Sequence, residues 1–190
     1  MLKNKGSILL RIVGLLIFPL LAFAEIPWNV SELSNPPQMT ELKTTEPGVH
    51  AIKFTSVPLK GKPTQVFAYY GIPEGKNLPA MVLVHGGGGT AFAEWVRLWN
   101  QRGYAAIAMD TTGTLPETAT ADQLWNPKRT RLEESGPAGW GGFGQIAEPV
   151  KDQWTYHAVA SVILAHSLIR SFPEVDSQRI GLTGISWGGY

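Results

Sequence analysis

Two uninterrupted apolar runs, residues 80–84 and 105–109, constrain the fold more than any other feature of this sequence. A strand with one face in water alternates apolar and polar residues, whereas these two runs contain no polar residue. Strands buried on both faces belong to parallel sheets that are covered by helices on both sides. Residues 179–183 are predicted to form a third strand of the same sheet.

Two helical patterns separate these predicted strands. Apolar and aromatic residues recur at helical spacing between residues 92 and 99, with Thr90 as the expected N-cap and Gly103 as the stop. A longer helix is predicted from about Asp152 to Ser171. Its expected apolar stripe consists of Ala158, Val162, Ala165 and Ile169.

A hairpin is predicted ahead of the alternating strands and helices. Residues 49–57 and 64–72 are rich in β-branched and aromatic residues, and a Lys-Gly-Lys-Pro turn separates them. Strands that alternate with helices imply right-handed crossovers and parallel pairing. The predicted fold class is therefore α/β, in three layers, with a mostly parallel sheet and an N-terminal antiparallel hairpin.

The first residues read as a targeting segment. Residues 1–24 combine a basic start, an apolar run and small residues at positions 22 and 24, which is typical of a signal peptide cleaved before Glu25. We therefore expect a secreted or periplasmic protein without stable membrane association after cleavage. Residues 25–48 are polar and aperiodic and are expected to be an extended leader into a domain that spans residues 49–190.

Composition excludes several classes of function. The chain has 16 Lys and Arg against 15 Asp and Glu, a net charge of +1, which is unlike the basic surface of a nucleic-acid binder. It contains no cysteine, so disulfides, thiolate metal sites and a cysteine nucleophile are all excluded. No metal site and no cofactor are predicted.

The strongest chemical motif is Gly184-Ile185-Ser186-Trp187-Gly188. This G-x-S-x-G pattern becomes specific when it follows a strand, because the serine then sits on a sharp turn with its hydroxyl exposed above the sheet. Residues 180–183 supply such a strand. Ser186 is therefore the candidate nucleophile.

A glycine-rich turn, residues 85–89, directly follows the first buried strand. An acyl-transfer reaction needs N–H donors for the developing oxyanion, and glycines let the backbone approach a substrate closely. Gly86, Gly87 or Gly88 could supply one donor, and the N–H of Trp187 the other. A tight structural turn is the alternative, whereas a Walker A loop is excluded because no Gly-Lys-Ser/Thr follows.

Residues 111–151 form an unusually long connection between the second buried strand and the long helix. At the carboxyl edge of a parallel sheet, such a loop can contact substrate, and Trp125 and Trp140 are its candidates for stacking on a sugar ring. An extra structural lobe is an equal alternative. A G-x-G-x-x-G match at residues 139–144 follows no buried strand, so it does not indicate a nucleotide site.

These motifs together resemble the α/β-hydrolase superfamily. The segment at residues 179–190 looks like secreted acetylxylan-esterase and prolyl-oligopeptidase-type hydrolases, and residues 152–157 are similar to the acetylxylan-esterase branch. The resemblance implies a serine hydrolase that cleaves carboxylic esters, including acetyl groups on polysaccharide. Its partner would be a small ester or an acetylated carbohydrate.

The same resemblance exposes a departure from the family pattern. In this fold the catalytic acid and histidine follow the serine along the chain, and neither follows Ser186 here. His157 and His166 lie on opposite sides of one predicted helix, His85 belongs to the glycine turn, and Asp110 is expected to stabilise a turn. We therefore expect the C-terminal strands to be missing and the 190-residue chain to be inactive and poorly soluble.

Two other functions stay open at the level of sequence. Prolyl-oligopeptidase-like peptidases share the serine turn, although they carry a large N-terminal domain that this chain does not contain. A non-catalytic binding module on the hydrolase fold would retain the turn without a catalytic base.

Overall fold

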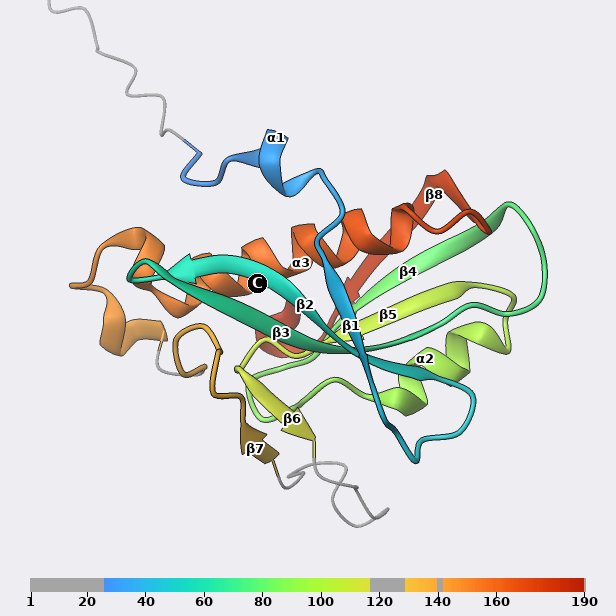
Figure 1. Cartoon of the computed structure of the whole chain (residues 1–190), viewed down its shortest axis with the longest axis horizontal. Coiled ribbons are helices and arrows are strands. Elements are labelled where there is room, and N and C mark those ends of the chain that lie inside the picture. The colour runs from blue at the N-terminus through green and yellow to red at the C-terminus, as the bar shows by residue number, and fades with distance from the viewer. Residues whose placement is uncertain (1–25, 117–128, 140–141, 190) are drawn as a thin grey trace, which may run out of the picture.

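A mixed sheet covered by helices on both faces forms the centre of the molecule (Figure 1). The computed structural model describes residues 26–116, 129–139 and 142–189, and within them six strands form this sheet in the order β1-β2-β3-β5-β4-β8. In chain order the strands are β1 (Met39–Leu42), β2 (His50–Leu59), β3 (Lys62–Gly71), β4 (Leu78–Val84), β5 (Ala105–Met109) and β8 (Val175–Gly184). A separate two-stranded ribbon consists of β6 (Thr114–Pro116) and β7 (Arg129–Arg131).

The pairing pattern confirms the predicted fold class. Strands β5, β4 and β8 pair in parallel, while β1, β2, β3 and β5 pair antiparallel in sequence along the sheet. Helix α2 (Ala93–Asn100) connects β4 to its neighbour β5. Helix α3 (Trp154–Arg170) lies on the connection from β5 to β8, and β8 pairs with the other edge of β4. The carboxyl end of β4 therefore lies where the strand order reverses, the usual place for a ligand crevice in such sheets.

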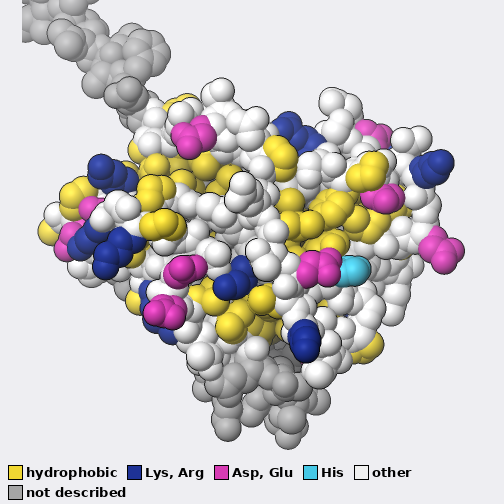
Figure 2. Space-filling view, in the orientation of Figure 1, with side chains coloured by type: hydrophobic (Ala, Val, Ile, Leu, Met, Phe, Trp, Pro, Cys, Tyr) yellow, Lys and Arg dark blue, Asp and Glu magenta, His cyan; other side chains and the backbone are white. Residues whose placement is uncertain are grey.

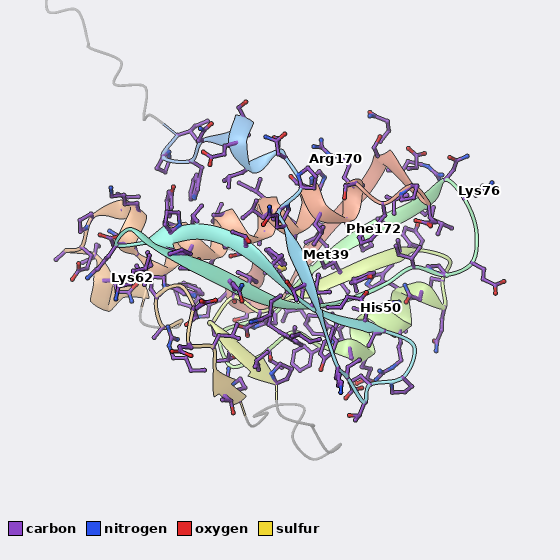
Figure 3. The ribbon with its side chains drawn as sticks, viewed as in Figure 1. Met39, His50, Lys62, Lys76, Arg170 and Phe172 are labelled. Atoms are coloured by element: carbon purple, nitrogen blue, oxygen red, sulfur yellow. The ribbon has the colours of Figure 1, made fainter. Side chains whose placement is uncertain are left out.

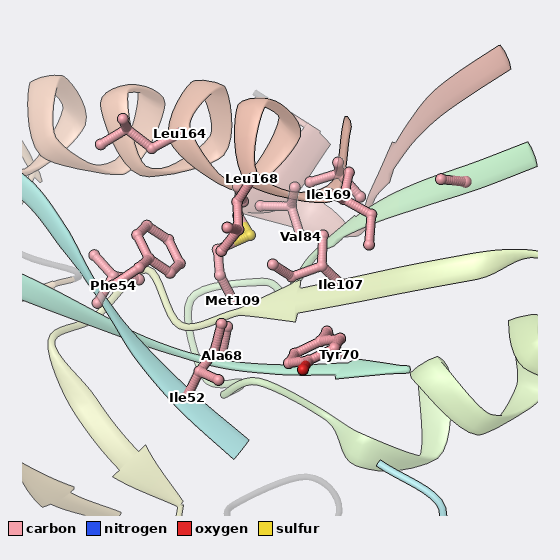
Figure 4. Packing of buried hydrophobic residues seen from close by; sticks show 14 of the residues in the cluster. Ile52, Phe54, Ala68, Tyr70, Val84, Ile107, Met109, Leu164, Leu168 and Ile169 are labelled. Atoms are coloured by element: carbon pink, nitrogen blue, oxygen red, sulfur yellow. The ribbon is translucent and has the colours of Figure 1, made fainter. Parts of the chain in front are cut away.

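The two helices cover opposite faces of the sheet. On one face, Ile107, Met109 and Ile169 of α3 are fully buried together (Figure 4). On the other face, Val96 of α2 packs in a second cluster with Leu83. Adjacent residues of β4 point to opposite faces of the sheet, and Leu83 and Val84 are buried on the two faces. This burial on both faces explains why the run at residues 80–84 contains no polar residue.

The hairpin is confirmed, and its strands are longer than predicted. Leu59 pairs with Lys62, so the turn consists of Lys60 and Gly61 alone. Both residues have positive φ, 50° and 79°, as the two-residue hairpin turn that matches strand twist requires.

Residues 25–48, expected to be an extended leader into the domain, contain two short elements. Strand β1 pairs antiparallel with β2, and the one-turn helix α1 (Val30–Leu33) packs against α3. The hydroxyl of Ser167 donates to the carbonyl of Leu33 at 2.7 Å, and Arg170 donates to the carbonyl of Ser34 at 2.6 Å; Figure 3 shows Arg170 on the side of α3 near α1. Both elements are four residues long, too short for periodicity to reveal, and are held by distant partners.

The start of α2 also differs from the prediction. Phe92, not Thr90, is the N-cap residue, and it has no side-chain capping bond. Thr90 and Ala91 are each 2% exposed, so both residues are buried. The helix begins only after them, at Ala93. The long helix begins at Trp154, after a short 3₁₀ turn at Val150–Asp152.

The surface carries acidic and basic side chains interspersed, as Figure 2 shows for one face. This distribution agrees with the net charge of +1. Across the described ranges, no helix is long and apolar enough to cross a membrane.

The packing of α3 predicts a clear difference between two positions on that helix. Ile169→Ala removes a fully buried side chain between α3 and the sheet, and should lower the free energy of unfolding by about 2–5 kcal/mol. The matched control Val159→Ala lies on the outer side of the same helix at 37% exposure and should change it by less than about 1 kcal/mol. Urea denaturation of the two variants measures the difference, and equal effects would contradict the assigned orientation of α3.

Candidate active site

The site is built where β4 and β8 end side by side. Val84 pairs with Gly184 in parallel register, so the turns that follow both strands leave the same edge of the sheet together. The N–H of Ile185 then donates to the carbonyl of Val84 at 3.1 Å. The glycine turn and the serine turn are therefore adjacent, although 100 residues separate the two paired positions along the chain.

Ser186 occupies the sharp turn that the sequence predicts. Its φ is +54°, a region that residues other than glycine rarely adopt, and its side chain is exposed. A 3₁₀ turn, Ser186–Gly189, follows it, closed by a bond from Gly188 N–H to Ile185 carbonyl at 2.9 Å. A nucleophile elbow requires a strained backbone at an exposed serine after a strand, and we refer to residues 184–188 as the elbow below.

The two glycines flanking the elbow are required by close backbone contact. A Cβ on Gly184 would overlap the carbonyl oxygen of Gly188. A Cβ on Gly188 would overlap the carbonyl oxygen of Val84 and would lie 2.7 Å from that of His85. No side chain fits in either place, so the elbow depends on both glycines.

The glycine turn lies directly against the elbow. A Cβ on Gly86 would lie 3.1 Å from Cβ of Ser186 and 3.0 Å from the carbonyl oxygen of Ile185. The turn itself is closed by the N–H of Gly89, which donates to the carbonyl of Gly86 at 2.9 Å.

The carbonyl direction of Gly86 also sets the direction of the next N–H. This carbonyl accepts from Gly89 N–H and from Nδ1 of His85 at 2.6 Å, so it points to the inner side of the turn. In a trans peptide the N–H points opposite to the carbonyl, so the N–H of Gly87 points away from His85. The N–H of Gly87 is therefore directed to the outer side of the turn.

His85 and Asp110 form a buried polar pair beneath the glycine turn. They are 1% and 2% exposed, and Nε2 of His85 lies 2.9 Å from the nitrogen of Thr111 and 3.4 Å from Oδ1 of Asp110. Because a carbonyl oxygen only accepts, Nδ1 of His85 carries a proton and donates to Gly86. Both ring nitrogens have partners inside the protein, so His85 holds the turn and is not a base for Ser186.

Asp110 stabilises the turn after β5, as the sequence analysis expected. Its carboxylate accepts from the backbone N–H groups of Thr112 and Thr114, both at 2.8 Å, and from the Thr112 hydroxyl. Burial raises the pKa of Asp110, but the donors of Thr114 and Thr112 outweigh burial and hold this pKa below its ordinary value of 3.8.

The two histidines of α3 are not brought together with Ser186. Nε2 of His157 contacts the carbonyl of Lys151 at 3.0 Å, and burial lowers the pKa of this ring. Burial, with the neighbouring Arg170, also lowers the pKa of His166. In the part of the chain that the structure describes, no three His, Cys, Asp or Glu side chains are grouped to hold a metal ion.

Trp187 is supported by a residue that sequence reasoning missed. Its ring lies edge-on to Trp154, with centroids 6.0 Å apart and planes at 83°. Trp154 is 5% exposed, and its ring N–H donates to the carbonyl of Thr111 at 2.6 Å. The first turn of α3 thereby contacts both the elbow and the chain after β5, a connection with no local sequence signal.

A cleft of about 790 Å³ opens beside Ser186. Residues 86–89 and Ile185 line one end, and α2 lines the other. Phe92 and Trp95 also line it, with ring centroids 4.8 Å apart. In the sequence, these two aromatic residues indicate only a helix, and nothing local to them indicates that they line a cleft. Trp125 and Trp140, the predicted sugar-stacking residues, lie outside the described residues, and their role stays a prediction.

A family of known proteins matches most of this chain. The model of the acetyl xylan esterase family matches residues 25–190. The chain belongs to the acetyl xylan esterase family. Membership supports an esterase-type hydrolase, in line with the resemblance seen in the sequence. No curated protein matches the sequence.

Solved acetyl xylan esterases share the fold. One from Paenibacillus sp. R4 is 23% identical, with a TM-score of 0.52, over 85% of this chain and 50% of its own. Acetyl xylan esterase 1 from Thermoanaerobacterium sp. JW/SL YS485 is 15% identical, with a TM-score of 0.53, over 86% of this chain and 52% of its own. The chain thus spans about half the length of these structures.

The backbone contacts at the elbow predict that alanine lowers the free energy of unfolding at one of two neighbouring glycines and leaves it almost unchanged at the other. Gly188→Ala forces its methyl group into the carbonyls of Val84 and His85, and should lower the free energy of unfolding by about 1–3 kcal/mol while displacing Ser186. Gly189→Ala meets nothing nearer than 3.6 Å and should stay within about 0.5 kcal/mol of the wild type. Thermal denaturation distinguishes them; a tolerated Gly188→Ala would contradict the close approach of the two turns.

The buried carboxylate predicts a pH-dependent stability. Because the folded pKa of Asp110 lies below its unfolded value, its contribution is complete above about pH 4 and is lost as pH falls through the folded pKa. Asp110→Asn should therefore lower the free energy of unfolding by roughly 2–3 kcal/mol at pH 7. In urea denaturation at several pH values, the gap between variant and wild type should close below pH 4. A gap that stays constant there would contradict this role.

Proposed function

We propose that this protein is a serine esterase that removes acetyl groups from carbohydrate through an acyl-enzyme on Ser186. The observation that carries the proposal is the contact between the elbow at Ser186, with its φ of +54°, and the glycine turn at Gly86. Membership in the acetyl xylan esterase family supports the esterase class and an acetylated carbohydrate as substrate.

The reaction would follow from the groups that converge beside the cleft. The Ser186 hydroxyl loses its proton to a base and attacks the acetyl carbon, and the carbonyl oxygen becomes an oxyanion. The N–H groups of Gly87 and Trp187 would hold this oxyanion. We choose Gly87 as the donor from the glycine turn because its N–H points outward from the turn. The alcohol then leaves with a proton, and water releases acetate and restores the serine.

The base in this scheme is not assigned to a described residue. The rings of His85 and His157 are bonded inside the protein, which is inconsistent with proton transfer from Ser186. In this fold the acid and the histidine follow the serine along the chain. We place them there, and we place the protein outside the cytoplasm on the strength of the predicted signal peptide.

The cleft suggests how a sugar would be held. Phe92 and Trp95 lie beside the glycine turn, and the faces of aromatic rings pack well against the apolar faces of sugar rings. We propose that the alcohol part of the substrate lies along this aromatic pair while its acetyl group faces Ser186.

Turnover of an acetyl ester by the protein made from its full reading frame tests this proposal. Ser186→Ala should lower kcat by more than about 10³-fold because the nucleophile is lost. The matched control Ser177→Ala changes an exposed serine near the start of β8, the strand that leads to Ser186, and should leave turnover unchanged. Hydrolysis of a dipeptide anilide in preference to the acetyl ester would indicate a peptidase. Absence of any Ser186-dependent turnover would favour a binding module.

A further inference from the structure

Arg129 connects the ribbon of β6 and β7 to the glycine turn. It is the first residue of β7, and its Nη1 donates to the carbonyl of Gly89 at 2.7 Å. The two residues are 40 positions apart in the chain. Neither the glycine motif nor the elbow motif includes this arginine.

The turn is therefore held from both ends. Nδ1 of His85 donates to the carbonyl of Gly86 at one end, and Arg129 donates to the carbonyl of Gly89 at the other. The bond from Gly89 N–H to Gly86 carbonyl joins the two ends. Four consecutive glycines have more conformational freedom than any other tetrapeptide, so a turn made of them needs bonds from outside to keep one shape.

The ribbon that presents Arg129 is itself anchored to the end of β5. Thr114, at the start of β6, donates its N–H to Asp110, and Arg129 pairs with Pro116 at the far end of β6. On the same strand, Arg131 donates to the carbonyls of Thr112 and Gly136. The guanidinium of Arg129 thus reaches Gly89 from a support that is tied to the buried His85–Asp110 pair.

We propose that Arg129 is a positioning residue, which fixes the outward direction of the Gly87 N–H by holding Gly89. This inference rests on the proposed function, in which that N–H binds the oxyanion. A donor that is already aligned lowers the barrier because no reorganisation is needed when charge develops. Loss of Arg129 should then affect turnover more than substrate binding.

The experiment compares Arg129→Gln with Arg129→Lys and with the control Lys62→Gln in the protein made from its full reading frame. Hydrogen exchange of the amides of residues 86–91 reports on the turn without requiring activity. In Arg129→Gln this exchange should rise roughly 10- to 100-fold, the range of a charge-assisted hydrogen bond. For a small acetyl ester, kcat should fall by roughly 10- to 100-fold, with KM within about twofold because binding energy is retained.

The other two variants separate positioning from general stability. Arg129→Lys keeps a cationic donor and should recover part of both effects. Lys62→Gln also removes a positive charge, but this residue is exposed at the hairpin end of β3, so exchange at residues 86–91 and kcat should both stay within about twofold of wild type.

Each result decides the inference. Unchanged exchange at residues 86–91 in Arg129→Gln overturns it, whether or not the protein is active. Raised exchange with unchanged kcat in an active enzyme also overturns it. If wild type hydrolyses no acetyl ester, the proposed function fails, and the exchange measurement alone still decides whether Arg129 holds the turn.

Discussion

The parallel pairing of β4 with β8 is the contact on which the rest of the site depends. Its register ends both strands at the same level, at Val84 and Gly184, and the next N–H still donates back to Val84. Paired strands lie only about 4.8 Å apart, which leaves no room for side chains between the turns that follow them. The glycines at 86 and 188 are consequences of that spacing, whereas Gly184 is required by close contact within its own turn.

A buried polar layer lies directly beneath these turns. His85 follows β4 and Asp110 follows β5, and both are inside the protein, where polar groups need hydrogen-bond partners. The partners come from the glycine turn and from the chain after β5, so satisfying the buried groups also shapes the site. Stability and active-site geometry therefore rest on the same hydrogen bonds.

Much of the fold could be predicted because its signals are local and strong. Residues 80–84 and 105–109 had to be buried on both sides, and the hairpin and long helix followed from composition and period. The predicted stripe of α3 was wrong in part, since Ala158 and Val162 are only half-buried while His157 and Ser161 are buried. The hydroxyl of Ser161 donates to the carbonyl of His157 in its own helix, so a polar residue can occupy the core. The cap at Thr90 failed because burial of that segment outweighed a local preference.

By itself, the sequence determined the hairpin, the buried strands, the turn at Ser186 and the glycine turn, because each depends on residues that are neighbours in the chain. Only the tertiary structure decided which glycine N–H points outward, how Trp154 supports Trp187, and that Arg129 reaches Gly89. The last two connections join residues 33 and 40 positions apart. Sheet register and packing bring these residues together, and no local pattern of residue types encodes such a meeting.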